Sequence, residues 1–239
     1  MREKIIKKAS STVVAFIGIL VIVLILSAKK SPALKRETAA KAYSILSLGD
    51  SYTIGEKVPT HDNFPNQAVQ QLKEKGYNFQ QPVIIAKTGW TTDELQSAIN
   101  KARLKNKYDF VTLLIGVNNQ YRGRKVVEYI PQFEELLKRA IKFTGNDSSS
   151  VIVLSIPDWG VTPFAEGRNR ENISKEIDEF NSANRLLAQQ FKVHYIDITP
   201  GSRKAGTDST LLTDDGLHPS AKEYNNWANQ IVAVIQKAF

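Results

Sequence analysis

Residues 46–56 read LSLGDSYTIGE, and the character of the chain changes within them. An apolar run, AYSILSL at residues 42–48, leads into this stretch and is typical of a buried β-strand. Gly49, Asp50 and Ser51 then follow where the strand would otherwise continue. The break indicates either an ordinary turn or a serine held at the edge of a sheet.

Apolar runs of the same kind recur along the chain and alternate with amphipathic stretches. They are continuous in Val, Ile and Leu, as expected for strands that are buried on both faces of a parallel sheet. We therefore predict one α/β domain of three layers over residues 42–239. The expected strands lie at 42–48, 82–86, 109–116, 150–156 and 193–198. The expected helices lie at 63–76, 92–105, 126–143, 171–191 and 220–238.

The leader, residues 1–41, differs in composition from the rest. Residues 13–26 are all apolar or Gly and follow four cationic side chains. This pattern is typical of a signal peptide, while the wider segment 12–28 is long enough for a single membrane span with Lys side chains reaching out at its ends. A cleaved signal and a retained anchor both stay open, followed by a basic tether at 29–41. Either one predicts export, to the periplasm, the exterior or a membrane-tethered position.

The formal net charge is +8. Residues 1–41 contain nine Lys and Arg side chains and two Glu side chains, a net charge of +7. The domain that follows is therefore close to neutral. Because phosphate binding requires a cationic field, no nucleic-acid partner is expected. The chain has no Cys, which excludes disulfides and lipid attachment through Cys.

Polar residues follow the first three expected strands, where Ser51, Gly89 and Asn118 stand. Each has a structural interpretation, as a turn, a helix approach or a cap. The carboxyl ends of parallel strands meet at one edge of a sheet, and ligands bind there. At such an edge, the backbone N–H groups of Ser51 and Gly89 and the side-chain amide of Asn118 could donate to an oxygen that becomes negative during acyl transfer.

Near the C-terminus, DDGLHPSAKEY at residues 214–224 pairs a carboxylate with an imidazole. Asp215 lies three residues before His218 and can fold back onto its Nδ1–H. A serine hydroxyl becomes a nucleophile when a base accepts its proton, and the base needs an acceptor to fix its tautomer. Ser51, His218 and Asp215 can supply these roles. The alternative is a turn with an incidental His before a capping box of Ser220 and Glu223.

Four blocks of the sequence together resemble the SGNH, or GDSL, hydrolase family. They are GDSY at 49–52, Gly89, GVNN at 116–119 and DGLH at 215–218, in that order. The resemblance extends from residue 42 to the C-terminus and implies a flavodoxin-like α/β/α fold with a five-stranded parallel sheet. The nucleophile elbow G-x-S-x-G of the larger α/β-hydrolases is absent, since Thr53 occupies the second Gly position.

The resemblance also implies site residues. Ser51 would be the nucleophile, His218 the base and Asp215 its orienting acid, with Ser51, Gly89 and Asn118 as the oxyanion hole. Asn119 departs from the family, which often has Asp there, and affects a supporting position.

The implied function is an exported serine esterase that forms an acyl-enzyme and needs no metal or cofactor. Lysophospholipids, short acyl esters and acetylated polysaccharides all stay open as substrates, and a monomer is expected. Two alternatives remain. One is a non-catalytic glycan- or lipid-binding module on the same scaffold. The other is a metal-dependent phosphodiesterase, although the chain lacks an H-x-H or H-E-x-x-H ligand pair.

Several further residues have two interpretations. His61 is expected in a loop and His194 in a strand with a structural role. Arg122 and Arg124 either approach a helix in solvent or face an anionic substrate. Three aromatic residues after strands either line an acyl or sugar pocket or pack in the core: Trp90, Trp159 and Phe164.

Overall fold

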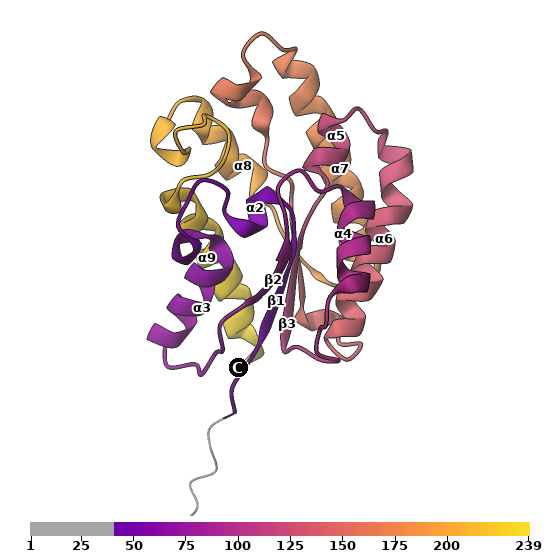
Figure 1. Ribbon diagram of the computed structural model, residues 1–239, viewed down its shortest axis with the longest axis vertical. Coiled ribbons are helices and arrows are strands. Elements are labelled where there is room, and N and C mark those ends of the chain that lie inside the picture. Colours follow the sequence, from indigo (N-terminus) through magenta and orange to yellow (C-terminus); the bar gives the residue numbers. More distant parts are fainter. Residues whose placement is uncertain (1–40) are drawn as a thin grey trace, which may run out of the picture. The chain divides into compact units, whose positions relative to one another are not determined.

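The structure, a computed structural model, describes residues 41–239 as a five-stranded sheet between two helical layers (Figure 1). The strands are β1 (Ile45–Gly49), β2 (Val83–Ala86), β3 (Phe110–Leu114), β4 (Val151–Leu154) and β5 (His194–Ile196). Their order is β2-β1-β3-β4-β5, and every neighbouring pair is parallel. This is the flavodoxin-like arrangement, so the predicted fold class is confirmed.

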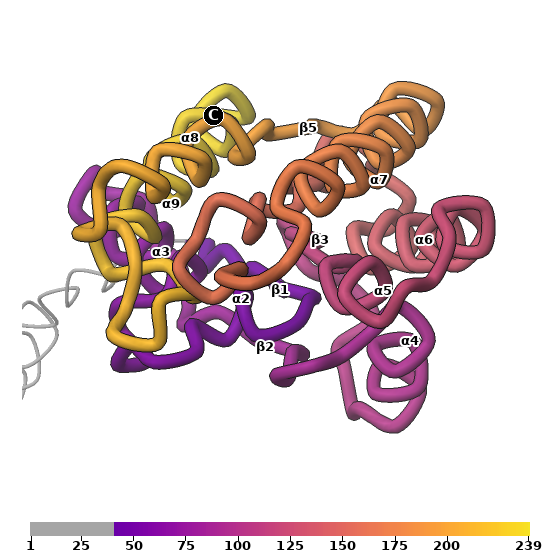
Figure 2. The backbone as a smooth tube through the Cα atoms, turned by 90° about the horizontal axis from the view of Figure 1, so that it is seen from above, coloured from indigo at the N-terminus to yellow at the C-terminus, as the bar shows by residue number. Residues whose placement is uncertain are grey.

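Two helices cover one face of the sheet and three cover the other (Figures 1 and 2). The first layer is α3 (Phe64–Glu74) and α9 (Ala221–Ile235), and the second is α4 (Thr92–Lys101), α6 (Val126–Phe143) and α7 (Arg170–Gln190). Three short helices follow strands β1, β3 and β5 respectively: α2 (Ser51–Ile54), α5 (Val117–Tyr121) and α8 (Thr199–Ser202). The 3₁₀ turns are η1 (Thr60–Asp62), η2 (Ser148–Ser150), η3 (Trp159–Val161), η4 (Pro163–Ala165), η5 (Arg203–Gly206), η6 (Ser209–Leu211) and η7 (Gln236–Ala238).

The central strands explain the continuous apolar runs of the sequence. Every residue of β1 and β3 is buried. Leu46 of β1 pairs with Val83 on one side and Val111 on the other, so it has helices above and below and strands at both edges. Helix α6 instead buries one stripe, at the three- and four-residue spacing of an amphipathic helix: Tyr129, Phe133, Leu136, Leu137 and Ala140.

The capping box predicted at the start of α9 forms only in part. Ser220 accepts a hydrogen bond from the Glu223 backbone N–H, as predicted for the start of α9. The Glu223 side chain does not return to Ser220, and instead accepts from Trp227 Nε1 at 2.8 Å and from Asn226. Because Trp227 is fully buried, its N–H needs an acceptor, and this need prevails over the capping box.

The predicted strands and helices are present, but the strands are shorter than their predicted ranges. Strand β1 begins at Ile45 rather than 42, and β5 is limited to residues 194–196. Helix α6 has the bounds that were predicted, 126–143. The apolar run shows that a segment is buried, whereas the neighbouring strand decides where its hydrogen bonds end.

The predicted leader with its possible span at residues 12–28 lies outside the described residues. Among the helices of residues 41–239, none has both the length and the apolar character that a bilayer crossing requires.

Candidate active site

Ser51 lies at the junction of β1 and α2. An added Cβ at Gly49 would lie 2.0 Å from Thr53 Oγ1 and 2.4 Å from the Leu114 carbonyl oxygen, so only glycine permits this close approach of the strand to α2 and β3. Asp50 caps α2 by accepting from the Tyr52 N–H at 3.1 Å. Ser51, the first helical residue, is therefore held at the carboxyl edge of the sheet and is 5% exposed.

Asp50 is the unusual member of this turn, because it is a carboxyl group that is 1% exposed. Its Oδ1 accepts from Tyr52, while its Oδ2 is buried without a hydrogen-bond partner among the described residues. Burial raises the pKa of Asp50 to about 7. The motif thus contains an acid that favours its neutral form in the folded protein.

His218 and Asp215 form a hydrogen-bonded pair, as the three-residue spacing predicted. Asp215 Oδ2 lies 2.6 Å from His218 Nδ1, and Asp215 Oδ1 accepts from the backbone N–H groups of Leu217 and His218 and from the Thr213 hydroxyl, each at 2.9 Å. Burial acts to raise the pKa of Asp215, but the hydrogen bonds from His218, Leu217 and Thr213 outweigh it and lower the pKa to about 2. The carboxylate therefore stays ionised and fixes the imidazole through Nδ1.

A cavity of about 170 Å³ brings four of the predicted residues together: Ser51, Gly89, Asn118 and His218. Asp215 lies behind the imidazole and does not line it. Although Ser51 and His218 both face this space, no hydrogen bond joins their side chains within residues 41–239. Ser51 and Val117, which line the cavity, come just after β1 and β3, the point at which the strand order reverses and where such sheets bind ligands.

Gly89 and Asn118 are tied to each other through the loop after β2. Gly89 has φ +83°, a conformation that side chains disfavour. Asn118 Nδ2 donates to the Trp90 carbonyl oxygen at 2.9 Å, and Arg122 Nη2 donates to the Gly89 carbonyl oxygen at 2.6 Å. An amide nitrogen carries two hydrogens, so one N–H of Asn118 is used in this contact and the second is available to a ligand.

Asn119, the position that departs from the resembled family, supports this loop. It is fully buried, accepts from the Thr92 N–H at 3.1 Å and donates to Thr92 Oγ1 at 2.8 Å. It thus joins the start of α5 to the start of α4, and an amide suits the position because it both donates and accepts.

Aromatic rings form one wall of the cavity. Trp159 and Phe164 line it, while Trp90 is partly buried against the core and does not. Tyr121, which sequence reasoning did not identify, also lines it and lies 5.4 Å from Trp159 between ring centroids. Its place three residues after Asn118 on a short helix is a signal that could have identified it.

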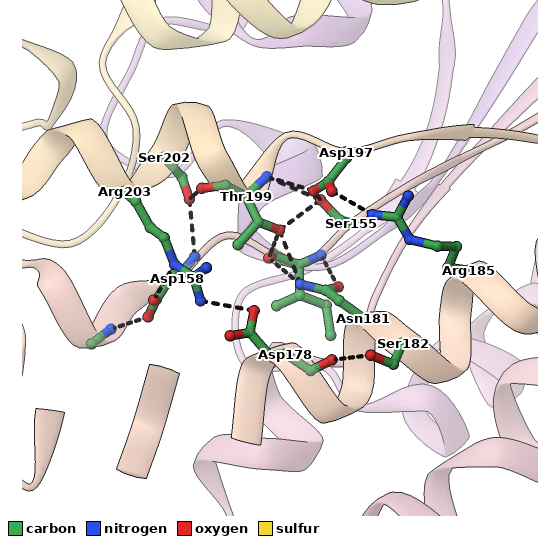
Figure 3. A network of polar contacts seen from close by, with 12 residues as sticks. Ser155, Asp158, Asp178, Asn181, Ser182, Arg185, Asp197, Thr199, Ser202 and Arg203 are labelled. Atoms are coloured by element: carbon green, nitrogen blue, oxygen red, sulfur yellow. Dashed lines mark hydrogen bonds and ion pairs between the residues drawn. The ribbon is translucent and has the colours of Figure 1, made fainter. Parts of the chain in front are cut away.

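A buried polar network holds the loop that carries Trp159 (Figure 3). The Asp158 carboxylate, fully buried, accepts from Arg203 Nε at 2.9 Å and from the Gly160 N–H at 2.8 Å. The Asp158 backbone N–H donates to Ser202 Oγ at 3.0 Å, and Arg203 also pairs with Asp178. These bonds join the start of η3 to α8, η5 and α7, and they hold the loop that carries Trp159.

The other candidate residues do not line the cavity. His61 is in η1 with its side chain 81% exposed, and His194 is in β5 as expected. Arg122 and Arg124 form ion pairs with Glu94 at 3.2 Å and Asp93 at 2.6 Å respectively. Across residues 41–239, no three His, Asp or Glu side chains are grouped so that they could hold a metal ion.

Known proteins resemble the chain in sequence pattern and in fold. The model of the GDSL-like Lipase/Acylhydrolase family matches residues 47–225. Among solved structures, a lipase/acylhydrolase from Enterococcus faecalis is 21% identical, with a TM-score of 0.64 and coverage of 82% of this chain and 96% of that one. The structure of TesA is 17% identical, with a TM-score of 0.65 and coverage of 82% and 99%.

A third solved structure is Axe2, an acetylxylan esterase from Geobacillus stearothermophilus. It is 17% identical, with a TM-score of 0.65 and coverage of 81% of this chain and 94% of that one. At these identities the solved structures support the fold alone. No curated protein sequence matches the chain.

Proposed function

The chain belongs to the GDSL-like lipase/acylhydrolase family and is a carboxylic ester hydrolase of the SGNH type. From this premise, we propose that Ser51 is the nucleophile, that His218 is the base and that Asp215 is the acid that orients His218. The catalytic domain is residues 42–239. The observation that carries the proposal is the cavity lined by both Ser51 and His218, with Asp215 at 2.6 Å from the far side of the imidazole.

In the proposed reaction, Ser51 Oγ attacks the ester carbonyl carbon while His218 Nε2 accepts the hydroxyl proton. The Asp215 carboxylate stabilises the imidazolium that forms. His218 then donates this proton to the departing alcohol, and water hydrolyses the acyl-enzyme by the same steps. The reaction requires a Ser51–His218 hydrogen bond in the substrate complex, as catalytic hydrogen bonds that are long in free enzymes often tighten when substrate binds.

The oxygen of the tetrahedral intermediate would be stabilised by three donors. These are the backbone N–H groups of Ser51 and Gly89 and the free N–H of the Asn118 side chain. All three residues line the cavity, and the bonds from Arg122 to Gly89 and from Asn118 to Trp90 keep the loop in place before substrate arrives. Donors that are already oriented need no reorganisation during the reaction.

The cavity supports a small acyl group in an apolar setting, with Val117, Leu217 and the aromatic wall around it. The similar structures include a lipase/acylhydrolase and an acetylxylan esterase, which leaves lipid and glycan esters as the two substrate classes to compare. Export through the leader, as a cleaved signal or a membrane tether, completes the proposal, and mass spectrometry of the native N-terminus distinguishes the two.

The test is labelling of the full chain with a fluorophosphonate, followed by peptide mass spectrometry. The label should appear on Ser51 alone, and Ser51→Ala should lose both the label and hydrolysis of p-nitrophenyl acetate. The matched control is Ser182→Ala, which removes an exposed serine on α7 that bonds only to a backbone carbonyl. Labelling of another serine, or wild-type turnover in Ser51→Ala, would contradict the proposal. Loss of turnover with EDTA instead would favour a metal-dependent reaction.

A further inference from the structure

Arg168 lies over the aromatic wall of the cavity. Its guanidinium carbon is 5.1 Å from the ring centroid of Tyr121, 5.4 Å from Trp159 and 5.6 Å from Phe164. All three rings line the cavity that contains Ser51. A cation is therefore held, by attraction to three aromatic rings, against residues that line the site.

The guanidinium has most of its hydrogen-bonding capacity free. Arg168 Nη2 donates to the Tyr121 hydroxyl at 3.2 Å, and no carboxylate pairs with Arg168 in the described part of the chain. Arg122 and Arg124, which follow α5 in the chain, both pair with acids of α4. Since a guanidinium has five N–H donors in a planar fork, stacking on rings leaves its edge free to bind an oxyanion.

The structure also fixes where Arg168 lies. It is in the loop between η4 and α7, where its backbone N–H donates to the Ala165 carbonyl oxygen at 3.1 Å. The neighbouring loop is anchored by the ion pair between the buried Asp158 carboxylate and Arg203. Arg168 thus extends from a supported loop toward rings that are themselves packed together, with Trp159 and Phe164 centroids 5.9 Å apart.

Charge differs between the two sides of the cavity. On the side of Thr88 and Gly89, the Glu56 carboxylate accepts from the Thr88 hydroxyl, which lines the cavity, and the Arg122 cation that donates to the Gly89 carbonyl oxygen is paired with Glu94. On the aromatic side, the Arg168 guanidinium lies over all three rings and has no carboxylate partner among residues 41–239. A substrate with one anionic group would therefore bind with that group toward Tyr121 and Phe164.

We propose that Arg168 gives the site a preference for esters that carry an anionic group, a carboxylate or a phosphate, beside the scissile bond. The inference rests on the proposed esterase function and names its substrate class. Arg168 forms a charge-assisted hydrogen bond with the anion, which holds the ester carbonyl near Ser51. It is a binding residue and takes no part in the proton transfers.

The experiment compares 4-acetoxybenzoate with its methyl ester, which differs by one negative charge. In Arg168→Gln, kcat/KM for the anionic ester should fall about tenfold further than for the neutral one, as expected for one hydrogen bond to a charged group. Arg168→Lys should recover part of this difference because it keeps the charge. Each comparison is between two enzymes on one substrate, so intrinsic reactivity cancels.

The matched control is Arg103→Gln, which removes the same charge from an exposed residue in the loop before β3, at the opposite edge of the sheet. This control substitution should change kcat/KM by the same factor for the anionic and the neutral ester. Replacing the carboxylate by phosphate, in 4-acetoxyphenyl phosphate, distinguishes the two anions, since the larger loss in Arg168→Gln identifies the one that Arg168 binds.

If Arg168→Gln lost the same factor in kcat/KM on the charged and the neutral ester, the inference would be overturned and Arg168 would be a packing residue. Binding measured without turnover separates this failure from failure of the esterase proposal. Calorimetry should show 4-acetoxybenzoate binding to Ser51→Ala about tenfold more tightly than to Ser51→Ala/Arg168→Gln. Equal affinities would likewise overturn it, whether or not Ser51 is the nucleophile.

Discussion

Replacing Asp215 by Asn should reduce ester hydrolysis far more than it reduces stability. In the wild-type protein, the backbone N–H groups of Leu217 and His218 donate to Asp215 Oδ1 at 2.9 Å. The side-chain amide of Asp215→Asn keeps an oxygen that can accept these two hydrogen bonds. Its amide nitrogen would replace Oδ2, 2.6 Å from His218 Nδ1. Because two donors cannot face each other, the imidazole would keep its proton on Nε2 and could not accept one from Ser51.

The magnitude follows from the charge that is lost. The two side chains are 22% and 9% exposed, so an effective dielectric constant of about 20 applies, and a charge pair about 4 Å apart is then worth about 4 kcal/mol. At 1.36 kcal/mol for each factor of ten, the rate falls by about 10³ from charge alone. The wrong tautomer adds to this, and the same replacement in serine proteases costs about 10⁴.

The assay is kcat/KM for p-nitrophenyl acetate, with a thermal melt of each variant to show that it folds. Thr213→Val is the matched control, because it removes the hydroxyl that bonds to Asp215 Oδ1 and to the His218 carbonyl oxygen, but leaves the carboxylate and its bond to His218 Nδ1. It should cost about tenfold or less, as expected for one hydrogen bond to a charged group. A folded Asp215→Asn variant within tenfold of the wild-type rate would refute the reasoning that this carboxylate orients the base.

Two further predictions concern the loop after β3 and the buried acid of the motif. Asn118→Ala should lower kcat about 10²–10³-fold by removing one oxyanion donor, and steady-state kinetics showing the loss only in KM would contradict that role. Asp50 has a pKa raised by burial from 3.8 to about 7, so its contribution to stability is present below 3.8 and is lost as pH rises through 7, by up to about 4 kcal/mol. In urea unfolding, Asp50→Asn should therefore flatten the decline in stability between pH 4 and 8, whereas an unchanged decline would show that another group causes it.

Much of the fold could be predicted because its causes are local. Helix α6 buries a stripe of one residue in every three or four, and that periodicity is visible in the sequence. The strands were recognisable because burial on both faces requires continuous apolar residues. Their ends were not, since these depend on hydrogen bonds to segments far along the chain, such as the bridge between Tyr43 and Phe79.

The residues of the candidate site, like the fold, could be predicted only in part. Asp215 and His218 are close in sequence, so their contact is a local property. Ser51, Gly89 and Asn118 could be expected at one edge only because parallel strands share the direction of their carboxyl ends. The aromatic wall was only partly predicted, because Tyr121 and Trp159 come from segments whose approach depends on how α5 and η3 pack.

The sequence by itself determined the buried strands, the helical periodicity and the family motifs, all of which are properties of neighbouring residues. Within residues 41–239, tertiary structure alone decided that Asp50 is buried with an unpaired oxygen, that Arg122 and Arg124 are paired, and that Arg168 lies over the aromatic wall with no carboxylate partner. The physical reason is that burial and charge pairing depend on which distant side chains lie within a few ångströms. A linear pattern carries no such distances, and the packing of the layers supplies them.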